Sequence, residues 1–507
     1  MVASHQTRSL RDLLLFGSAT LGIAVGLERV LGFVSSILAA RISGPRTFGA
    51  YSVVLATAGT IAAYAGAGIG TTATRFSGQY PRASPGYRKF LWTIIAIGLA
   101  SAVGGALLML AGAGPLARWV LRNEALIPIL RVAAISSAAI ILFECCRGLL
   151  IGQQRFRSQL VLSIVFGIGL VIVLPLAASS SAALMVAGQA SVALSCVAIC
   201  VVFAKPLGIS PINSQKSNTG PGARPLLGFG LVQFGAFAGV SVATWWVALL
   251  VARSDATLAQ MGLYAIANQF RGLAALAPML CSQVGYPLLT NESGSKFGGA
   301  NRVMLTNSML AAALATMAAG LAIVFAPWVL LLVYGKSFTG AEGPVLILLA
   351  TGIIHMSGGP AMQRLSIVHL RALGIINAVW AVVIVTLGLW LVPAWGAAGA
   401  ALAFLISHAL SNLLVGLSLS RLRELPRGYL PLMASCTAGS LALAIVAYCR
   451  AMSPANSFIL TAVLGAIWIM ALLSIWQIST KTGCLSEWAR KPFIFAPSPD
   501  QSDVARS

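Results

Sequence analysis

Charged residues are scarce in this sequence. Only 9% of its 507 residues are Asp, Glu, Lys or Arg, whereas about 25% are charged in a typical soluble protein, so a water-soluble globular fold is excluded. The acidic residues number only 11 and include no pair arranged as in a glycosidase. The P-loop pattern that binds nucleotide phosphates is also missing. We therefore predict no catalytic residues, no metal site and no cofactor.

Long apolar runs, in contrast, fill the chain. Hydrophobic residues make up 58% of it, and its mean hydropathy is +0.90. The runs number about fourteen, and each is long enough to cross a ~30 Å hydrocarbon core as a helix. They lie at 13–40, 48–72, 90–112, 126–150, 159–178, 182–204, 226–252, 260–284, 304–333, 344–363, 367–392, 397–419, 429–449 and 456–478. This pattern predicts an all-α polytopic membrane protein of about 14 transmembrane helices.

Basic residues outnumber acidic residues by 33 to 11. If the N-terminus lies in the cytoplasm, 23 of the basic residues fall on the cytoplasmic side and eight on the opposite side. Positive charge collects on the cytoplasmic side of membrane proteins, so both termini are predicted to be cytoplasmic. No compact basic domain is present, and we predict no nucleic-acid partner.

Two halves of the chain resemble each other. Ala40-Arg41 precedes the segment Phe48-Gly49-Ala50-Tyr51, and Ala252-Arg253 precedes the segment Met261-Gly262-Leu263-Tyr264. Such a repeat is typical of secondary transporters, although apolar segments also resemble each other by chance. The predicted organisation is an N-terminal six-helix bundle (1–204), a cytoplasmic linker (205–225), a C-terminal six-helix bundle (226–420), two additional transmembrane helices (421–480) and a cytoplasmic tail (481–507).

One segment carries a family resemblance. The segment from Ala40 to Tyr51 (ARISGPRTFGAY) resembles the "ARxLGPxxFGxY" signature of Wzx-type polysaccharide biosynthesis flippases, in the multidrug/oligosaccharidyl-lipid/polysaccharide (MOP) exporter superfamily. Ser43 replaces the usual apolar residue. The segment Ala65 to Phe76 (AGAGIGTTATRF) resembles a second family segment, "DxGLxxAxxRF". The resemblance implies a MATE-like fold. A purely structural interpretation is also open, because Gly44-Pro45 is suited to end a helix and turn the chain.

Ionisable groups inside the predicted spans are candidates for function, because they normally face a bundle interior or a water-filled cavity. Glu28 and Arg29 lie midway along the first span, where adjacent side chains point about 100° apart. The Arg29 guanidinium suits a pyrophosphate, since its donors match two phosphate oxygens; an internal pair with Glu28 is the alternative. The resemblance implies the same role for Arg29, because the family's lipid-pyrophosphate flippases use arginines in a central cavity. Glu28 is a candidate for coupling to H⁺ or Na⁺.

Further candidates lie deeper in the chain. Glu144 and Arg147 stand three residues apart and could form a structural pair, or Arg147 could bind substrate. Arg271 lies in the eighth span and is a candidate cavity cation. His355 could be a packing residue, a sugar ligand or a proton-coupling group. The remaining candidate substrate ligands are Arg364, Gln233 and Gln269.

The resemblance implies a flippase that moves a polyprenyl-pyrophosphate-linked oligosaccharide across the inner membrane, for exopolysaccharide, capsule or O-antigen biosynthesis. Its expected partners are this lipid, other membrane lipids and other polysaccharide assembly proteins. One alternative is a MATE-like, cation-coupled drug or metabolite antiporter, which would more naturally present intramembrane acids. The other is a membrane glycosyltransferase or polymerase, which usually needs a large external loop; the external loops predicted here are short.

Overall fold

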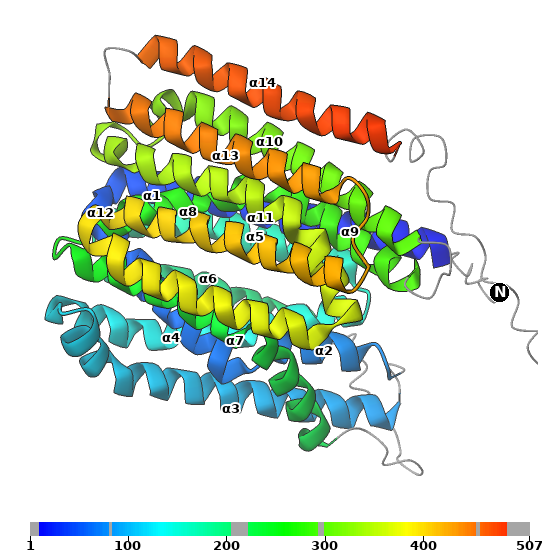
Figure 1. The fold of residues 1–507 in the computed structure, drawn as a ribbon. Coiled ribbons are helices and arrows are strands. Elements are labelled where there is room, and N and C mark those ends of the chain that lie inside the picture. Colours follow the sequence, from blue (N-terminus) through cyan, green and yellow to red (C-terminus); the bar gives the residue numbers. More distant parts are fainter. Residues whose placement is uncertain (1–9, 81–83, 204–221, 293–298, 453–456, 484–507) are drawn as a thin grey trace, which may run out of the picture.

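The computed structural model describes residues 10–80, 84–203, 222–292, 299–452 and 457–483. Within these ranges every regular element is a helix, and Figure 1 shows the long helices lying side by side with nearly parallel axes. The all-α fold class is thereby confirmed. The predicted linker (205–225) and tail (481–507) fall almost wholly outside the described residues.

The helices follow one another with short connections. The N-terminal half contains α1 (Leu10–Gly66), α2 (Ile69–Ser77), α3 (Pro85–Pro115), a π-helical turn η1 (Leu116–Val120), a 3-10 turn η2 (Glu124–Leu126), α4 (Ile127–Gly152), α5 (Phe156–Ala178) and α6 (Ala182–Phe203). The C-terminal half contains α7 (Ala223–Ser254), α8 (Ala259–Ala274), α9 (Leu276–Glu292), α10 (Gly299–Val333), a 3-10 turn η4 (Lys336–Ala341), α11 (Glu342–Val368) and α12 (Leu370–Arg421). Two further helices complete the chain, α13 (Tyr429–Met452) and α14 (Ser457–Thr482).

Ten helices in the described ranges are long and apolar enough to cross a membrane. Two of them are kinked and each covers two predicted spans. Helix α1 is kinked at Gly44, with φ 73° and ψ 172°, and α12 at Gly396, with φ 52° and ψ −127°. The predicted turn at Gly44-Pro45 is therefore confirmed. The chain is a multi-pass membrane protein, and the total of fourteen spans stays a prediction.

The predicted span at 48–72 is wrong in one respect, because its helix is interrupted. Ala67 and Gly68 have φ values of 39° and 73°, and the chain resumes as α2. Helix α7 packs closely at this point, since a β-carbon added to Gly230 would lie 2.5 Å from the carbonyl oxygen of Ala67. The predicted span at 260–284 is likewise divided into α8 and α9, around Ala275. A run of apolar residues does not encode such breaks, because contacts with distant segments help to set them.

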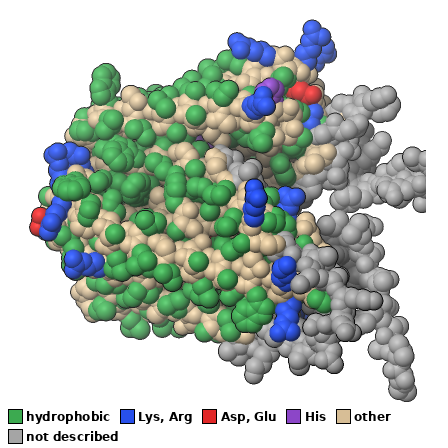
Figure 2. Space-filling view, turned by 90° about the horizontal axis from the view of Figure 1, so that it is seen from below, with side chains coloured by type: hydrophobic (Ala, Val, Ile, Leu, Met, Phe, Trp, Pro, Cys, Tyr) green, Lys and Arg blue, Asp and Glu red, His purple; other side chains and the backbone are tan. Residues whose placement is uncertain are grey.

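The outer surface suits a lipid environment. Hydrophobic side chains cover much of the visible face between the two ends of the helices, and Lys and Arg gather at those ends (Figure 2). Among the most exposed residues are Phe458 at 86%, Trp390 at 81% and Leu332 at 77%. Large apolar side chains in such numbers are unfavourable in water and favourable against acyl chains.

The last two helices are fixed to the C-terminal half by a buried arginine. Pro327 in α10 has no N–H, so the carbonyl oxygen of Ile323, four residues earlier, lacks its helical donor. Arg450 of α13 donates to this oxygen and to that of Val324, at 2.9 Å each, and pairs with Glu342 of α11 at 3.3 Å. Arg450 is only 3% exposed. Helices α13 and α14 therefore pack as part of the C-terminal half.

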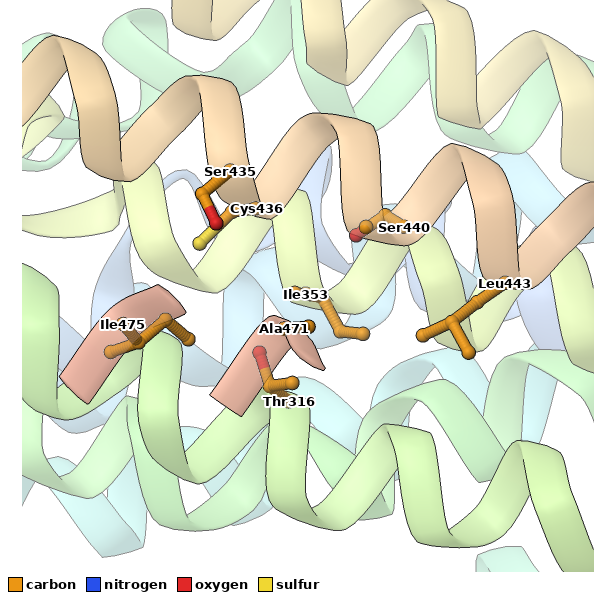
Figure 3. A pocket seen from close by; sticks show the side chains of 9 residues that line it. Thr316, Ile353, Ser435, Cys436, Ser440, Leu443, Ala471 and Ile475 are labelled. Carbon is orange, nitrogen blue, oxygen red and sulfur yellow. The ribbon is translucent and has the colours of Figure 1, made fainter. Parts of the chain in front are cut away.

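A crevice between α10, α11, α13 and α14 is closely packed (Figure 3). Its lining consists of Thr316, Ile353, Ser435, Cys436, Gly439, Ser440, Leu443, Ala471 and Ile475. It is too narrow to hold a water molecule, and its lining has no charged side chain. The crevice is thus unsuited to an anionic headgroup.

Candidate functional site

One face of α1 is directed toward the C-terminal half. Gly22, Arg29 and Phe33 share this face, because they are separated by multiples of a helical turn. Phe33 packs edge-on against Phe270 of α8, with ring centroids 5.4 Å apart. A β-carbon added to Gly22 would lie 3.8 Å from the side chain of Leu280 in α9. Arg29 therefore lies between two points at which the halves touch.

Arg29 is exposed and makes no ion pair or hydrogen bond with any residue that the structure describes. Its neighbour Glu28 is instead paired with Arg147 of α4, at 3.2 Å. The alternative of an internal Glu28–Arg29 pair is therefore not observed. The Arg29 guanidinium is left available to an anion between the halves.

A polar cluster lies inside the N-terminal half. Nη1 of Arg147 lies 3.2 Å from Oε1 of Glu28 and 3.2 Å from Oε1 of Glu144, so the predicted pair along α4 is observed. Ser163 of α5 donates to the other oxygen of Glu28 at 3.0 Å. The three charged residues, here called the acidic cluster, border a cavity of about 140 Å³ that Gln189 also lines. Two carboxylates and one guanidinium leave one negative charge in excess, which favours a cation.

A second cluster lies inside the C-terminal half. Cζ of Arg271 lies 5.0 Å from the centroid of the Phe404 ring, and its Cγ lies beside Gly352 of α11. His408 stacks on Phe404 with ring centroids 5.9 Å apart, and it meets His355 edge-on at 4.6 Å. Arg271, His355 and His408 are here called the basic cluster. None of the three pairs with a carboxylate in the described part of the chain.

The hydrogen bonds of the basic cluster define its chemistry. Nδ1 of His408 lies 2.9 Å from the carbonyl oxygen of Phe404, and because a carbonyl only accepts, Nδ1 donates. Nδ1 of His355 is buried and has no hydrogen-bond partner among the described residues. His355 thus offers a ring nitrogen for a proton or a polar ligand close to His408 and Arg271.

The other predicted ligands have different surroundings. Arg364 is buried and pairs with Glu424 at 2.7 Å, which ties α11 to the segment after α12. Oε1 of Gln269 is buried without a partner among the described residues. Gln233 belongs to α7, but its side chain lies outside the described part. Substrate binding by Arg147, Arg364, Gln233 and Gln269 stays a prediction.

Sequence reasoning missed the aromatic residues around the two candidate arginines. Phe33 follows Arg29 by one helical turn, and Phe270 directly precedes Arg271, so the spacing could have indicated both. Phe404 lies more than 130 residues from Arg271, and no local signal indicates their contact.

The sequence matches the family described as "Polysaccharide biosynthesis protein" over residues 14–291, which is more than half of the chain. The chain belongs to this polysaccharide biosynthesis protein family. The matched region includes Glu28, Arg29 and Arg271. The resemblance seen in the Ala40 to Tyr51 segment is thereby confirmed. No curated protein sequence matches this family member significantly.

Solved structures share the fold of this polysaccharide biosynthesis protein. "Lipid II flippase MurJ, inward closed conformation" aligns with a TM-score of 0.65 and 16% identity, covering 91% of this chain and 99% of that chain. An inward-facing multidrug resistance MATE family transporter of the MOP superfamily aligns with a TM-score of 0.62 and 14% identity, covering 79% and 98%. The MATE multidrug transporter DinF-BH aligns with a TM-score of 0.59 and 15% identity, covering 82% and 97%. The fold is MATE-like, and these relatives are transporters and flippases, not enzymes.

Proposed function

We propose that the protein flips a polyprenyl-pyrophosphate-linked oligosaccharide from the cytoplasmic to the outer leaflet of the inner membrane, with both termini in the cytoplasm. The observation that carries this proposal is the pair Arg29 and Arg271, two intramembrane guanidinium groups with no carboxylate partner among the described residues. An uncompensated charge inside a membrane is costly. An anionic ligand that neutralises the two guanidinium groups would offset this cost. A pyrophosphate suits them, because each guanidinium can donate to two phosphate oxygens.

The proposed mechanism is alternating access between α1–α6 and α7–α12. The headgroup occupies the space between the halves, on Arg29 and Arg271, while the polyprenyl chain remains in the bilayer. Membership of the polysaccharide biosynthesis family and the fold shared with a lipid II flippase support this substrate class.

Coupling to H⁺ or Na⁺ is assigned first to Glu28. The acidic cluster has one negative charge in excess and a cavity beside it. Neutralising Glu28 weakens its attraction for Arg147 and therefore alters the contact between α1 and α4. His355 is the second candidate, because its Nδ1 is without a partner among the described residues.

A cation-coupled antiporter is the second candidate function. The carboxylates of Glu28 and Glu144 line the same cavity of about 140 Å³, and MATE transporters share the fold. An organic cation would be bound there by charge, and Arg29 would then have no role in binding.

Transport in proteoliposomes tests the two functions against each other. The purified protein is reconstituted with a labelled polyprenyl-pyrophosphate oligosaccharide, and the Arg29→Ala and Arg271→Ala variants are compared with Arg46→Ala, which removes an exposed arginine with no described partner. We expect each cavity variant to lose at least about tenfold in transport, because a charge-assisted hydrogen bond contributes about 1.5–3 kcal/mol. Arg46→Ala should transport like the wild type. A wild type that moves no such lipid but expels an organic cation under an ion gradient would establish the antiporter instead.

A further inference from the structure

The family signature at residues 40–51 has no role in the function proposed above, although it is the most recognisable segment of the chain. It lies at the end of the bundle that holds the kink of α1 at Gly44, here called the outer end according to the predicted topology. Several contacts of this segment cross the boundary between the two halves.

Arg41 binds the last turn of α10. The final carbonyl groups of a helix have no donor within the helix and need one elsewhere. In α10, the carbonyl groups of Leu330 and Leu331 accept from the N–H of Gly335. The next two, those of Leu332 and Val333, accept from Nη1 of Arg41 at 3.0 and 3.5 Å. A side chain of the N-terminal half therefore completes a helix of the C-terminal half.

Two glycines let the backbones of the halves touch beside this bond. A β-carbon added to Gly49 would overlap the carbonyl oxygen of Leu258, and one added to Gly262 would overlap that of Pro45. Gly49 and Gly262 occupy matching positions in the two repeats. Each repeat thus contributes the glycine that admits the backbone of the other.

The segment before α8 is ordered by its own hydrogen bonds. Asp255 accepts from the backbone N–H groups of Thr257 and Gln260, at 2.9 and 3.1 Å. Burial by itself would raise the pKa of Asp255, but these hydrogen bonds outweigh burial and lower the pKa. Asn123 of the N-terminal half donates to the carbonyl oxygen of Ala256 at 3.3 Å. The charged carboxylate of Asp255 therefore holds the start of α8 in one conformation, and Asn123 of the opposite half contacts the ordered segment.

Along the face of α1 that carries Arg29, the boundary is looser toward the other end of the helix. Ala39 and Ala40 are fully buried near the outer end, whereas Arg29 is exposed and a β-carbon added to Gly26 would meet no atom within 4 Å. Along this face of α1, the halves are therefore joined more closely at the signature than at Arg29, while α7 makes a separate close contact with the N-terminal half at Ala67.

We propose that these contacts form the outer gate of the transporter and that Arg41 is its latch. The proposal rests on the alternating access of the proposed function, but it does not depend on the identity of the cargo. In the outward-open state Arg41 releases the end of α10, and the two glycine contacts part. Arg41 is exposed, so water replaces its bonds at little cost, as a reversible latch requires.

Hydrogen exchange of the protein in lipid nanodiscs, without substrate, tests the latch. The peptides that cover residues 44–49 and 258–262 are followed in Arg41→Gln, Arg41→Lys and the matched control Arg46→Gln. We expect Arg41→Gln to exchange roughly five-fold faster at both peptides, since it loses charge-assisted hydrogen bonds. Arg41→Lys should stay near the wild type, because an ammonium group can still donate to one carbonyl oxygen. Arg46→Gln should match the wild type.

A second pair of variants tests the glycine contacts. Gly262→Ala places a methyl group on the backbone of Pro45, whereas Gly272→Ala, in the same helix α8, meets no atom within 4 Å. We expect residues 44–49 to exchange faster in Gly262→Ala than in the wild type, and to exchange at the wild-type rate in Gly272→Ala. The gate would be refuted if Arg41→Gln exchanged at the wild-type rate, or if Arg46→Gln raised the exchange rate as much as Arg41→Gln. An increase in exchange rate that extended equally to α3 would also refute it.

The exchange result also separates this proposal from the proposed function. If the latch variants behave as expected and no lipid-linked oligosaccharide is transported, the gate stands and the substrate is wrong. If the oligosaccharide is transported and the latch variants exchange like the wild type, the substrate stands and the gate is wrong.

Discussion

The two halves of this transporter have opposite charge in their interiors. The acidic cluster of the N-terminal half combines two carboxylates with one guanidinium around Arg147. The basic cluster of the C-terminal half places Arg271 beside two imidazoles, and none of these groups pairs with a carboxylate in the described residues. Two carboxylates against one guanidinium in the first cluster suit a cation, whereas the unpaired guanidinium of Arg271 in the second suits an anion.

The difference teaches that backbone contacts and polar side chains are set separately in the two halves. Gly49 and Gly262 keep matching positions because backbones meet there, and a side chain at either position would separate the halves. Glu28 and Arg271 have no such restriction. If the proposed function holds, the basic cluster is the side for the anionic headgroup and the acidic cluster is the side for the coupling cation.

The largest expected effect is on stability, in the N-terminal half. Arg147→Ala leaves Glu28 and Glu144 close together without their shared guanidinium. We expect a loss of about 2–4 kcal/mol in the free energy of unfolding, somewhat less than the roughly 3–5 kcal/mol for fully buried pairs, because the Arg147 side chain is 18% exposed. Thermal unfolding in detergent measures it, with Arg157→Ala as the exposed control. Recovery in the double variant Glu28→Gln/Arg147→Ala is expected, and its absence would contradict a charge effect.

The matching change in the C-terminal half should act on transport and leave stability nearly unchanged. Arg271→Ala strands no carboxylate, so we expect unfolding within about 1 kcal/mol of the wild type. Transport of the lipid-linked oligosaccharide should fall at least about tenfold, as one charge-assisted contact is lost. A destabilisation as large as that of Arg147→Ala would mean that the clusters do not differ as described.

A smaller effect is expected for coupling. Glu28→Gln removes the excess negative charge of the acidic cluster, so transport should lose its dependence on an imposed pH or Na⁺ gradient while the protein still folds. Glu124→Gln is the control, because its exposed carboxylate lies in η2 and pairs with Arg118, outside the acidic cluster. Gradient dependence that survives in Glu28→Gln would move the coupling site elsewhere.

The smallest effect is expected at His355. The residue packs against His408 and is not paired with a carboxylate among the described residues, so His355→Gln should change transport by less than about twofold. The rate is measured with and without the ion gradient. If this variant, and not Glu28→Gln, loses gradient dependence, coupling belongs to the basic cluster.

Much of the fold could be predicted because its causes are local. Apolar runs of sufficient length predict helices, and Gly44-Pro45 predicts the kink that the structure shows in α1. The pair Glu144–Arg147 could be predicted as well, because its members are three residues apart on one helix.

Contacts between distant segments could not be predicted. Glu28 and Arg147 are 119 residues apart, and from the sequence alone the only partner considered for Glu28 was its neighbour Arg29. The break at Ala67 and Gly68 accompanies the close approach of Gly230, which no pattern near residue 67 indicates. Arg364 looked like a candidate ligand because its partner Glu424 lies 60 residues further along.

The bond from Arg450 to α10 has a consequence for how the chain can be shortened. Helices α13 and α14 follow the two predicted six-helix bundles and are the obvious segment to remove. Here, deleting them would strand the carbonyl oxygen that Pro327 leaves without a donor, together with the carboxylate of Glu342, against lipid. A version of this chain without α13 and α14 would need another donor for the carbonyl oxygen of Ile323, or a residue with an N–H in place of Pro327.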